Sequence, residues 1–360
     1  MRPPTLALVA GAAAFLVVAA VGIVGFGNFS TGIDPAAGGD VVGANSFAVV
    51  LAVALVVAFA VYAGVEYAQT GRIESISSQF DTRTVVLMPF AIALNIVLGQ
   101  AVAGALKVPI YLDSIGTILV GALAGPIPGA VTGLLSNLLW TYVVPPPFHS
   151  DFAGAFAIVA AMIGVMAGLF GRAGWLRPRP DRSFAQLALG GGVAIVLILG
   201  LSYLAAVGYQ TIIGAPALSP QADNQLFVVL GWIALILVGG TILGLLALLF
   251  IRRDLTAAYV VVAGIATGIV AALISAPISA NVFSGVTGAG MDFLVAAFRQ
   301  AGADVQAATL GQGLISDPID KVTTYFVVYL ILSAMARRIK ARFPQGERLI
   351  EQPEIEGAAA

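Results

Sequence analysis

The amino-acid sequence predicts an all-α integral membrane protein with about ten transmembrane helices and both termini in the cytoplasm. Three observations predict this fold class: the composition, a series of long charge-free stretches, and the uneven distribution of basic residues. Of the 360 residues, 59% are hydrophobic and 10% are charged, whereas a soluble globular domain carries about 25% charged residues. Water cannot be the main solvent of such a chain.

The long charge-free stretches are the predicted membrane spans. A helix needs about 20 apolar residues to cross roughly 30 Å of hydrocarbon, and several stretches reach that length. They are Thr5–Phe26, Phe47–Val65, Thr84–Leu106, Phe152–Gly171, Phe184–Gly208, Leu226–Ile251 and Leu255–Ala280. A shorter last span, Val322–Ala336, gains a turn from Pro318, because proline suits the first turn of a helix. The first stretch exceeds the core of a signal peptide, about 7–15 residues, which favours a retained helix over a cleaved signal.

The basic residues predict which loops face the cytoplasm. Lys and Arg collect in cytoplasmic loops close to the spans, and here they cluster at the two ends and in alternate loops. The cytoplasmic set is Arg2, Arg72, Arg83, Arg172, Arg177, Arg179, Arg182, Arg252, Arg253, Arg337, Arg338, Lys340, Arg342 and Arg348. Only Lys107, Arg299 and Lys321 remain for the outer side.

The same count predicts a helical hairpin in the uncharged stretch Ser114–Val144. A single crossing there would invert every later loop and place most basic residues outside. Two short helices, Leu112–Ala124 and Ile127–Val144, keep them inside, and the prolines and glycines between these helices favour a tight turn. Helices this short are expected to be buried against neighbours rather than to face lipid.

Two further segments flank the last span. Met291, Leu294, Val295 and Phe298 follow the spacing of a helix with one apolar face, which predicts a helix lying on or capping the outer surface. The acidic tail that follows Phe343 is expected to be disordered.

The residue inventory excludes several kinds of chemistry. The chain has no cysteine and one histidine, which excludes disulfides and metal sites built from Cys and His. No phosphate-binding loop of the GxxxxGK[ST] type is present. His149, Ser150 and Asp151 are adjacent, and adjacent residues cannot form a catalytic triad. We therefore expect no enzymatic activity, no metal, no cofactor and no nucleic-acid partner.

Polar and aromatic residues at membrane depth are the candidates for a functional site, because burying them in lipid is costly. They are Asn95, Gln100, Asp113, Asn137, Trp140, Tyr142, Phe148, Asn281, Asp292, Asp317, Asp320, Lys321 and Tyr325. Each type has a structural alternative. The aspartates at predicted helix starts can be caps, the amides can join helices, and the aromatic residues can form an interfacial belt. Small residues four apart, as in Gly121–Gly125 and Gly129–Gly133, favour close helix packing.

Two blocks of sequence resemble one family of membrane proteins. The first is Val108-Pro-Ile-Tyr-Leu-Asp-Ser-Ile-Gly-Thr117, continued by Gly121–Pro126 and Gly129–Gly133. The second comprises Ala276-Pro-Ile, Phe283–Asp292 and Ser316-Asp-Pro-Ile-Asp-Lys321. In these residues and their order, the chain resembles the S component of an energy-coupling factor (ECF) transporter.

The resemblance implies a six-helix core with two additional hairpins. The core helices are Thr84–Leu106, Leu112–Ala124, Ile127–Val144, Phe152–Gly171, Leu255–Ala280 and Pro318–Ala336. The chain then divides into an N-terminal hairpin (1–83), the first part of the core (84–175), an inserted hairpin (176–253), the second part of the core (254–343) and the tail (344–360).

The resemblance also implies a function. An S component is a multi-pass protein of the prokaryotic cell membrane, surrounded by lipid. It captures a vitamin or related micronutrient from outside and works with a transmembrane T subunit and two ABC-type ATPases. The substrate-binding residues implied here are Asp113, Asn137, Trp140, Tyr142, Asn281, Asp292 and Lys321. The residues implied to dock the T subunit are Ala91, Ala93, Ala101 and Ala105.

Two other classes of function remain open at this stage. A membrane-embedded ligand sensor is one, although no output domain follows Phe343. A stand-alone secondary transporter is the other, although the sequence has no convincing internal repeat and few charges are expected at helix centres.

Overall fold

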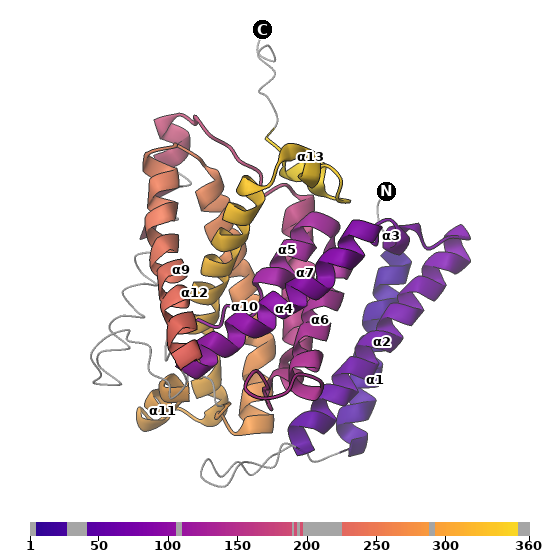
Figure 1. The fold of residues 1–360 in the computed structure, drawn as a ribbon. Helices are drawn as coiled ribbons and strands as arrows, with labels where there is room; N and C mark the ends of the chain where they lie inside the picture. Colours follow the sequence, from indigo (N-terminus) through magenta and orange to yellow (C-terminus); the bar gives the residue numbers. More distant parts are fainter. Residues whose placement is uncertain are drawn as a thin grey trace.

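The computed structural model describes residues 5–26, 42–105, 110–188, 191–192, 195–196, 225–287 and 292–351. Over these residues the chain is all-helical, without strands (Figure 1). The described helices that are long and apolar enough to cross a membrane are Ser46–Thr70, Thr82–Ala101, Ala153–Arg172 and Thr256–Phe283, and shorter apolar helices accompany them. These helices confirm the predicted class, an all-helical membrane-embedded protein.

The N-terminal hairpin consists of α1 (Thr5–Phe26) and α2 (Val42–Thr70), which pack against each other. Ala7 and Ala54 are fully buried between helices, whereas Val24 is 82% exposed. An apolar outer surface of this kind is stable only in lipid. A short helix, α3 (Glu74–Ser77), follows the hairpin.

The helix α4 (Thr82–Ala105) crosses the bundle obliquely (Figure 1). It begins where the carboxylate of Asp81 accepts a hydrogen bond from the backbone N–H of Thr84 at 2.8 Å, an N-terminal cap. The predicted span, Thr84–Leu106, therefore began two residues late.

The predicted helical hairpin is confirmed as α5 (Ile115–Ala124) and α6 (Pro126–Tyr142). Gly125 turns the chain between them with φ of 131°, a conformation that favours glycine. The helix α5 begins three residues later than predicted because Leu112, with φ of 54°, is left-handed. Every residue of α5 is buried, as expected for a helix too short to cross the membrane alone.

The next elements are a 3₁₀ turn, η1 (Ala153–Phe156), and α7 (Ala157–Arg172). Glycines let α7 approach the hairpin closely: a Cβ on Gly133 would lie 2.2 Å from the carbonyl oxygen of Ala160, and one on Gly121 would lie 2.8 Å from that of Gly164. The close packing predicted from small residues four apart is thus present on α5 and α6.

This packing makes a stability prediction. Gly133→Ala is expected to lower the free energy of unfolding by about 1–3 kcal/mol, because the added methyl group overlaps backbone atoms of α7. Gly64→Ala is the matched control. It lies in α2 with nothing within 4 Å of the added methyl, and alanine favours helix, so it should be neutral or stabilising. Thermal unfolding in detergent measures both, and equal melting temperatures would contradict the packing.

The second half of the chain contains α9 (Gln225–Phe250), α10 (Thr256–Phe283), α11 (Asp292–Gln300) and α12 (Val305–Ala334). Short elements, α13 (Arg337–Lys340) and η2 (Gly346–Leu349), close it. The helix α11 confirms the predicted amphipathic helix and packs on α12. Most of the predicted span Phe184–Gly208 lies outside the described residues, as do residues 352–360 of the acidic tail. The prediction of a disordered tail is wrong for residues 344–351, which contain η2 and the fully buried Leu349.

The predicted start of the last span is wrong. We expected Pro318 in the first turn, but α12 begins at Val305 and contains Pro318 in its interior. Asp304 caps the true start by accepting a hydrogen bond from the N–H of Ala307 at 2.7 Å. Pro318 is accommodated because Gly268 of α10 leaves room for it: a Cβ there would lie 2.4 Å from the proline nitrogen. Asp317 and Asp320 are therefore in a helix interior and are not caps.

The predicted cytoplasmic loops meet at one end of the molecule. Arg83 donates a hydrogen bond to the carbonyl oxygen of Arg342 at 3.3 Å, and Arg348 donates one to that of Arg172 at 2.6 Å. The basic end thus gathers loops that are far apart in the sequence, together with α3 and α13, whereas α11 lies at the opposite end (Figure 1). The loops that the charge pattern places on one side of the membrane thus lie at the same end of the structure.

Candidate functional site

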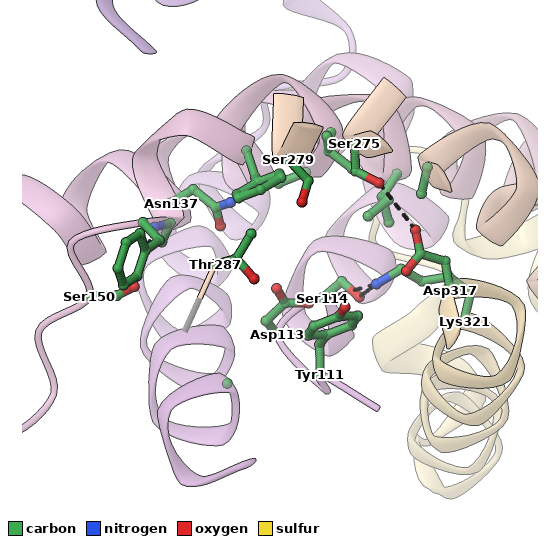
Figure 2. Close-up of a pocket in the computed structure, with 18 of the residues that line it drawn as sticks. Tyr111, Asp113, Ser114, Asn137, Ser150, Ser275, Ser279, Thr287, Asp317 and Lys321 are labelled. Atoms are coloured by element: carbon green, nitrogen blue, oxygen red, sulfur yellow. Dashed lines mark hydrogen bonds and ion pairs between the residues drawn. The ribbon is translucent and has the colours of Figure 1, made fainter. Parts of the chain in front are cut away.

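A cavity of about 190 Å³ lies between α6, α7, α10, α12 and the non-helical segment 110–114 (Figure 2). Part of its wall is aromatic, formed by Tyr111, Trp140, Phe152 and Phe156. The rest combines aliphatic residues, such as Ile110, Val159 and Ile163, with many polar side chains. The polar lining residues are Asp113, Ser114, Asn137, Ser150, Ser275, Ser279, Thr287, Gln312, Asp317 and Lys321.

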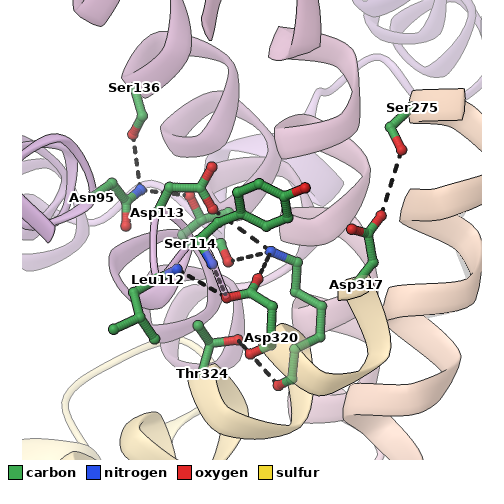
Figure 3. Close-up of polar contacts among 12 residues, drawn as sticks. Asn95, Leu112, Asp113, Ser114, Ser136, Ser275, Asp317, Asp320 and Thr324 are labelled. Atoms are coloured by element: carbon green, nitrogen blue, oxygen red, sulfur yellow. Dashed lines mark hydrogen bonds and ion pairs between the residues drawn. The ribbon is translucent and has the colours of Figure 1, made fainter. Parts of the chain in front are cut away.

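A charged cluster forms one side of the cavity (Figure 3). The ammonium group of Lys321 lies 2.5 Å from the carboxylate of Asp320, 3.7 Å from that of Asp113 and 2.8 Å from the hydroxyl oxygen of Ser114. Lys321 is 3% exposed and Asp320 is fully buried. Three buried charged groups, Asp317, Asp320 and Lys321, therefore lie inside the bundle, and Asp113 beside them is partly exposed. This corrects the expectation that charges are nearly absent from helix centres.

Asp320 also stabilises the break in the chain before α5. Its carboxylate oxygen accepts hydrogen bonds from the backbone N–H groups of Tyr111 and Leu112, both at 2.9 Å. Inside a membrane protein, non-helical backbone needs such partners because lipid offers none. Asp320 therefore links α12 to the segment that lines the cavity.

Asp317 is 7% exposed and lines the cavity. Its carboxylate accepts hydrogen bonds from the hydroxyls of Ser316 at 3.2 Å and Ser275 at 3.5 Å. Within the described part of the chain, no Lys, Arg or His lies within 4.0 Å of it. Asp317 is thus a buried carboxylate without a directly paired cation.

Two predicted residues on α6 line the cavity and carry polar atoms without a hydrogen-bond partner in the described chain. Asn137 is 4% exposed, and its side chain makes no hydrogen bond to any described residue. Trp140 is 6% exposed, and its buried indole Nε1 has no hydrogen-bond partner. The buried indole Nε1 is costly to leave unpaired, whereas the amide of Asn137, in the cavity lining, is available to a ligand.

The structure brings together four of the seven predicted substrate-binding residues: Asp113, Asn137, Trp140 and Lys321 line the cavity. The other three do not line it. Tyr142 is 48% exposed. Asn281 is exposed and accepts a hydrogen bond from Gln306 at 2.8 Å. Asp292 accepts hydrogen bonds from the N–H and the hydroxyl of Thr287, which does line the cavity.

Other candidates from the sequence have structural roles. Asn95 donates hydrogen bonds to the hydroxyls of Thr117 at 2.8 Å and Ser136 at 2.9 Å, and it accepts one from the N–H of Gly116 at 2.7 Å. This confirms the alternative that it joins helices. His149, Ser150 and Asp151 form no triad: Ser150 lines the cavity, whereas His149 contacts Asp151 at 2.9 Å and the carbonyl oxygen of Val144 at 3.0 Å.

The His149 contact predicts a small pH effect. The hydrogen bond that the His149 ring donates to the carboxylate of Asp151 raises the pKa of His149 above its usual value. A raised pKa means that the stabilisation is present at low pH and is lost as the pH rises through the folded-state pKa. Since the pair is partly exposed, we expect less than about 1 kcal/mol. Hydrogen exchange in residues 143–152 should be faster at about pH 8 than at about pH 5.5 after correction for intrinsic rates, and Asp151→Asn should remove the difference.

Sequence reasoning missed several lining residues. Ser275 and Ser279 are four residues apart on α10, a spacing that places them on one face and could have identified them. Gln312 was missed because the helix start was predicted too late. Tyr111 and Ser114 become recognisable only when the break before α5 is known.

Of the four alanines expected to dock a partner, the three whose side chains are described do not share one surface. Ala91 and Ala101 are buried inside the chain, Ala91 against Gly116 of α5, whereas Ala93 is exposed. The side chain of Ala105 lies outside the described residues.

Long apolar helices around a polar, aromatic-lined cavity define a helical membrane-embedded protein with an internal cavity suited to a small molecule. No protein-family model, curated protein or solved structure matches this chain.

Proposed function

We propose that this chain is the substrate-binding membrane subunit of an ECF-type importer, which captures a vitamin or related micronutrient from outside the cell. One observation carries the proposal. The two sequence blocks that resemble S components, 108–133 and 276–321, lie far apart in the chain but line the same cavity. The first contributes Tyr111, Asp113 and Ser114, and the second contributes Ala276, Thr287, Asp317 and Lys321.

The position of the cavity supports capture from outside. Basic loops mark the cytoplasmic side, and they gather at the end that carries α13 (Figure 1). The cavity is lined by Ser150 and Thr287, which belong to loops at the other end, beside α6's last turn and α11. A solute that enters by these loops reaches Asn137 and Trp140 without passing the basic end.

A stand-alone secondary transporter is the second candidate, and the charged cluster favours it. Asp113, Asp317, Asp320 and Lys321 lie within the bundle, where ionisable groups often couple ions to transport. The two candidates differ in energy source: the importer requires a T subunit and ATPases, whereas the secondary transporter requires only an ion gradient.

The test is affinity purification from the native host in mild detergent, after mild crosslinking, with mass spectrometry of the attached proteins. The importer predicts a T subunit and two ATPases. Recovery of the chain alone, combined with ion-driven uptake by liposomes that contain only this chain, would establish the secondary transporter instead. Recovery with a signalling kinase would indicate a sensor.

A further inference from the structure

The charges around the cavity do not balance. Asp113, Asp317 and Lys321 line it, and Asp320 lies directly behind Lys321. The closest partner of Lys321 is Asp320, at 2.5 Å, whereas Asp113 is 3.7 Å away. One ammonium group therefore faces three carboxylates, and its short ion pair is with the carboxylate outside the lining. A negative ligand would compete with Asp320 and Asp113 for an ammonium that is already engaged.

Asp317 lies on the side of the cavity opposite Asn137, and Ser275 and Ser279 lie along the wall between them (Figure 2). Its carboxylate is buried with only hydroxyl donors from Ser316 and Ser275. A buried carboxylate is stable when a positive charge approaches it or when it takes up a proton. A cationic group of the ligand, placed beside Asp317, would supply that charge.

The other side of the cavity offers a flat, partly polar surface. Trp140 and Phe152 belong to its wall, and an aromatic ring attracts both flat heterocycles and cations. The amide of Asn137 lies in the lining and has no hydrogen-bond partner in the described chain. A ring with a hydrogen-bond acceptor on its edge satisfies its N–H donor.

We propose that the ligand of this cavity is an organic cation that carries a flat heteroaromatic ring. Its positive charge lies beside Asp317 and Asp113, and its ring lies against Trp140 with an acceptor at Asn137. This inference rests on the proposed function, in which the cavity is the substrate site, and it adds the class of substrate. The charge imbalance disfavours an anionic substrate, and the aromatic wall favours an organic cation over a bare metal ion.

The sequence contains no cysteine, so a single cysteine can be introduced and its labelling rate used to measure the electrostatic potential in the cavity. In a Ser279→Cys variant the only thiol lies in the cavity wall, and in Ser284→Cys it lies on the exposed residue that ends α10. Each is labelled with a cationic methanethiosulfonate that carries trimethylammonium and with an anionic one that carries sulfonate. For each variant, the labelling rate of the cationic reagent is divided by that of the anionic reagent. We expect this ratio to be at least about tenfold higher at Ser279→Cys than at Ser284→Cys, because the carboxylates of the cavity lie close to Ser279.

Further substitutions in the Ser279→Cys variant test whether the cavity carboxylates cause its negative electrostatic potential. Asp317→Asn and Asp113→Asn should each lower the rate ratio several-fold. Asp304→Asn makes the same charge change at an exposed helix cap and should leave the ratio unchanged, since asparagine also caps well. A ratio at Ser279→Cys equal to that at Ser284→Cys would overturn the cation inference and leave the importer proposal standing.

The inference that the ligand carries a ring is tested by asking which small molecules protect the thiol of Ser279→Cys from labelling by a neutral methanethiosulfonate. Three probes share a pyridine ring: 1-methylnicotinamide is a cation, nicotinamide is neutral, and nicotinate is an anion. The cation should protect Ser279→Cys at a concentration at least tenfold lower than the other two. Equal or better protection by nicotinamide or nicotinate would overturn the inference that the ligand is a cation. If none of the three compounds protected the thiol, the inference that the ligand carries a heteroaromatic ring would be wrong. If the neutral reagent labels only Ser284→Cys, the cavity is closed, and the proposed function fails as well.

Discussion

Lys321→Met is expected to abolish most folded protein. The substitution leaves Asp320 fully buried without its cation and removes the partner of Asp113. Removing one member of a buried ion pair costs about 3–5 kcal/mol, a large share of a total stability of about 5–15 kcal/mol. The yield of monodisperse protein in detergent and its melting temperature measure the loss.

A second substitution should recover much of that loss. In Asp320→Asn/Lys321→Met the charge is gone, and the asparagine oxygen still accepts hydrogen bonds from the N–H groups of Tyr111 and Leu112. Asp320→Leu/Lys321→Met removes the charge and this acceptor together, so it should not recover. If both double variants recovered equally, the role of Asp320 in holding segment 110–114 would be wrong.

Asn137→Ala is expected to lower the affinity for the native ligand about 10- to 100-fold without loss of stability. Asn137 lines the cavity and its amide makes no hydrogen bond to the described chain. Alanine therefore removes a hydrogen bond to the ligand, worth about 1–3 kcal/mol, without breaking a contact within the described chain. The melting temperature of the empty protein should therefore stay constant or rise.

Asn95→Ala is the matched control for Asn137→Ala. Asn95 is also a buried asparagine, but its amide makes three hydrogen bonds that connect α4 with α5 and α6. Its substitution leaves these partners unpaired and should lower the melting temperature. A stability loss in Asn137→Ala as large as that in Asn95→Ala would show that Asn137 has a structural role instead of a ligand-binding one.

Local patterns were sufficient to predict the all-helical class and several helices of the described chain. The hairpin of α5 and α6 follows from charge sidedness and from the glycines and prolines at its turn. The start of α12 was missed because Pro318 suggested a helix start. In the structure Gly268, a residue far away in the sequence, makes room for this proline in the helix interior. A contact between distant residues overrides a local preference there.

Site residues could be predicted from the sequence where a polar side chain occurs within an otherwise apolar helix. Asn137 and Trp140 are three residues apart, so they share a face of α6 that looks into the cavity. Tyr142 lies off that face and is exposed. The role of Asp320 was not predictable, because it depends on a break at segment 110–114 that only tertiary structure reveals.

The most direct test of the central claim is small-molecule analysis of the protein purified from its native host. The wild-type chain, Asn137→Ala and Asn95→Ala are extracted in parallel and compared by mass spectrometry. We expect one compound of the size of a micronutrient to be enriched in the extracts of the wild type and of folded Asn95→Ala, and to be depleted in the extract of Asn137→Ala. A compound retained equally by Asn137→Ala, or no compound retained by the wild type, would contradict the cavity as a substrate site.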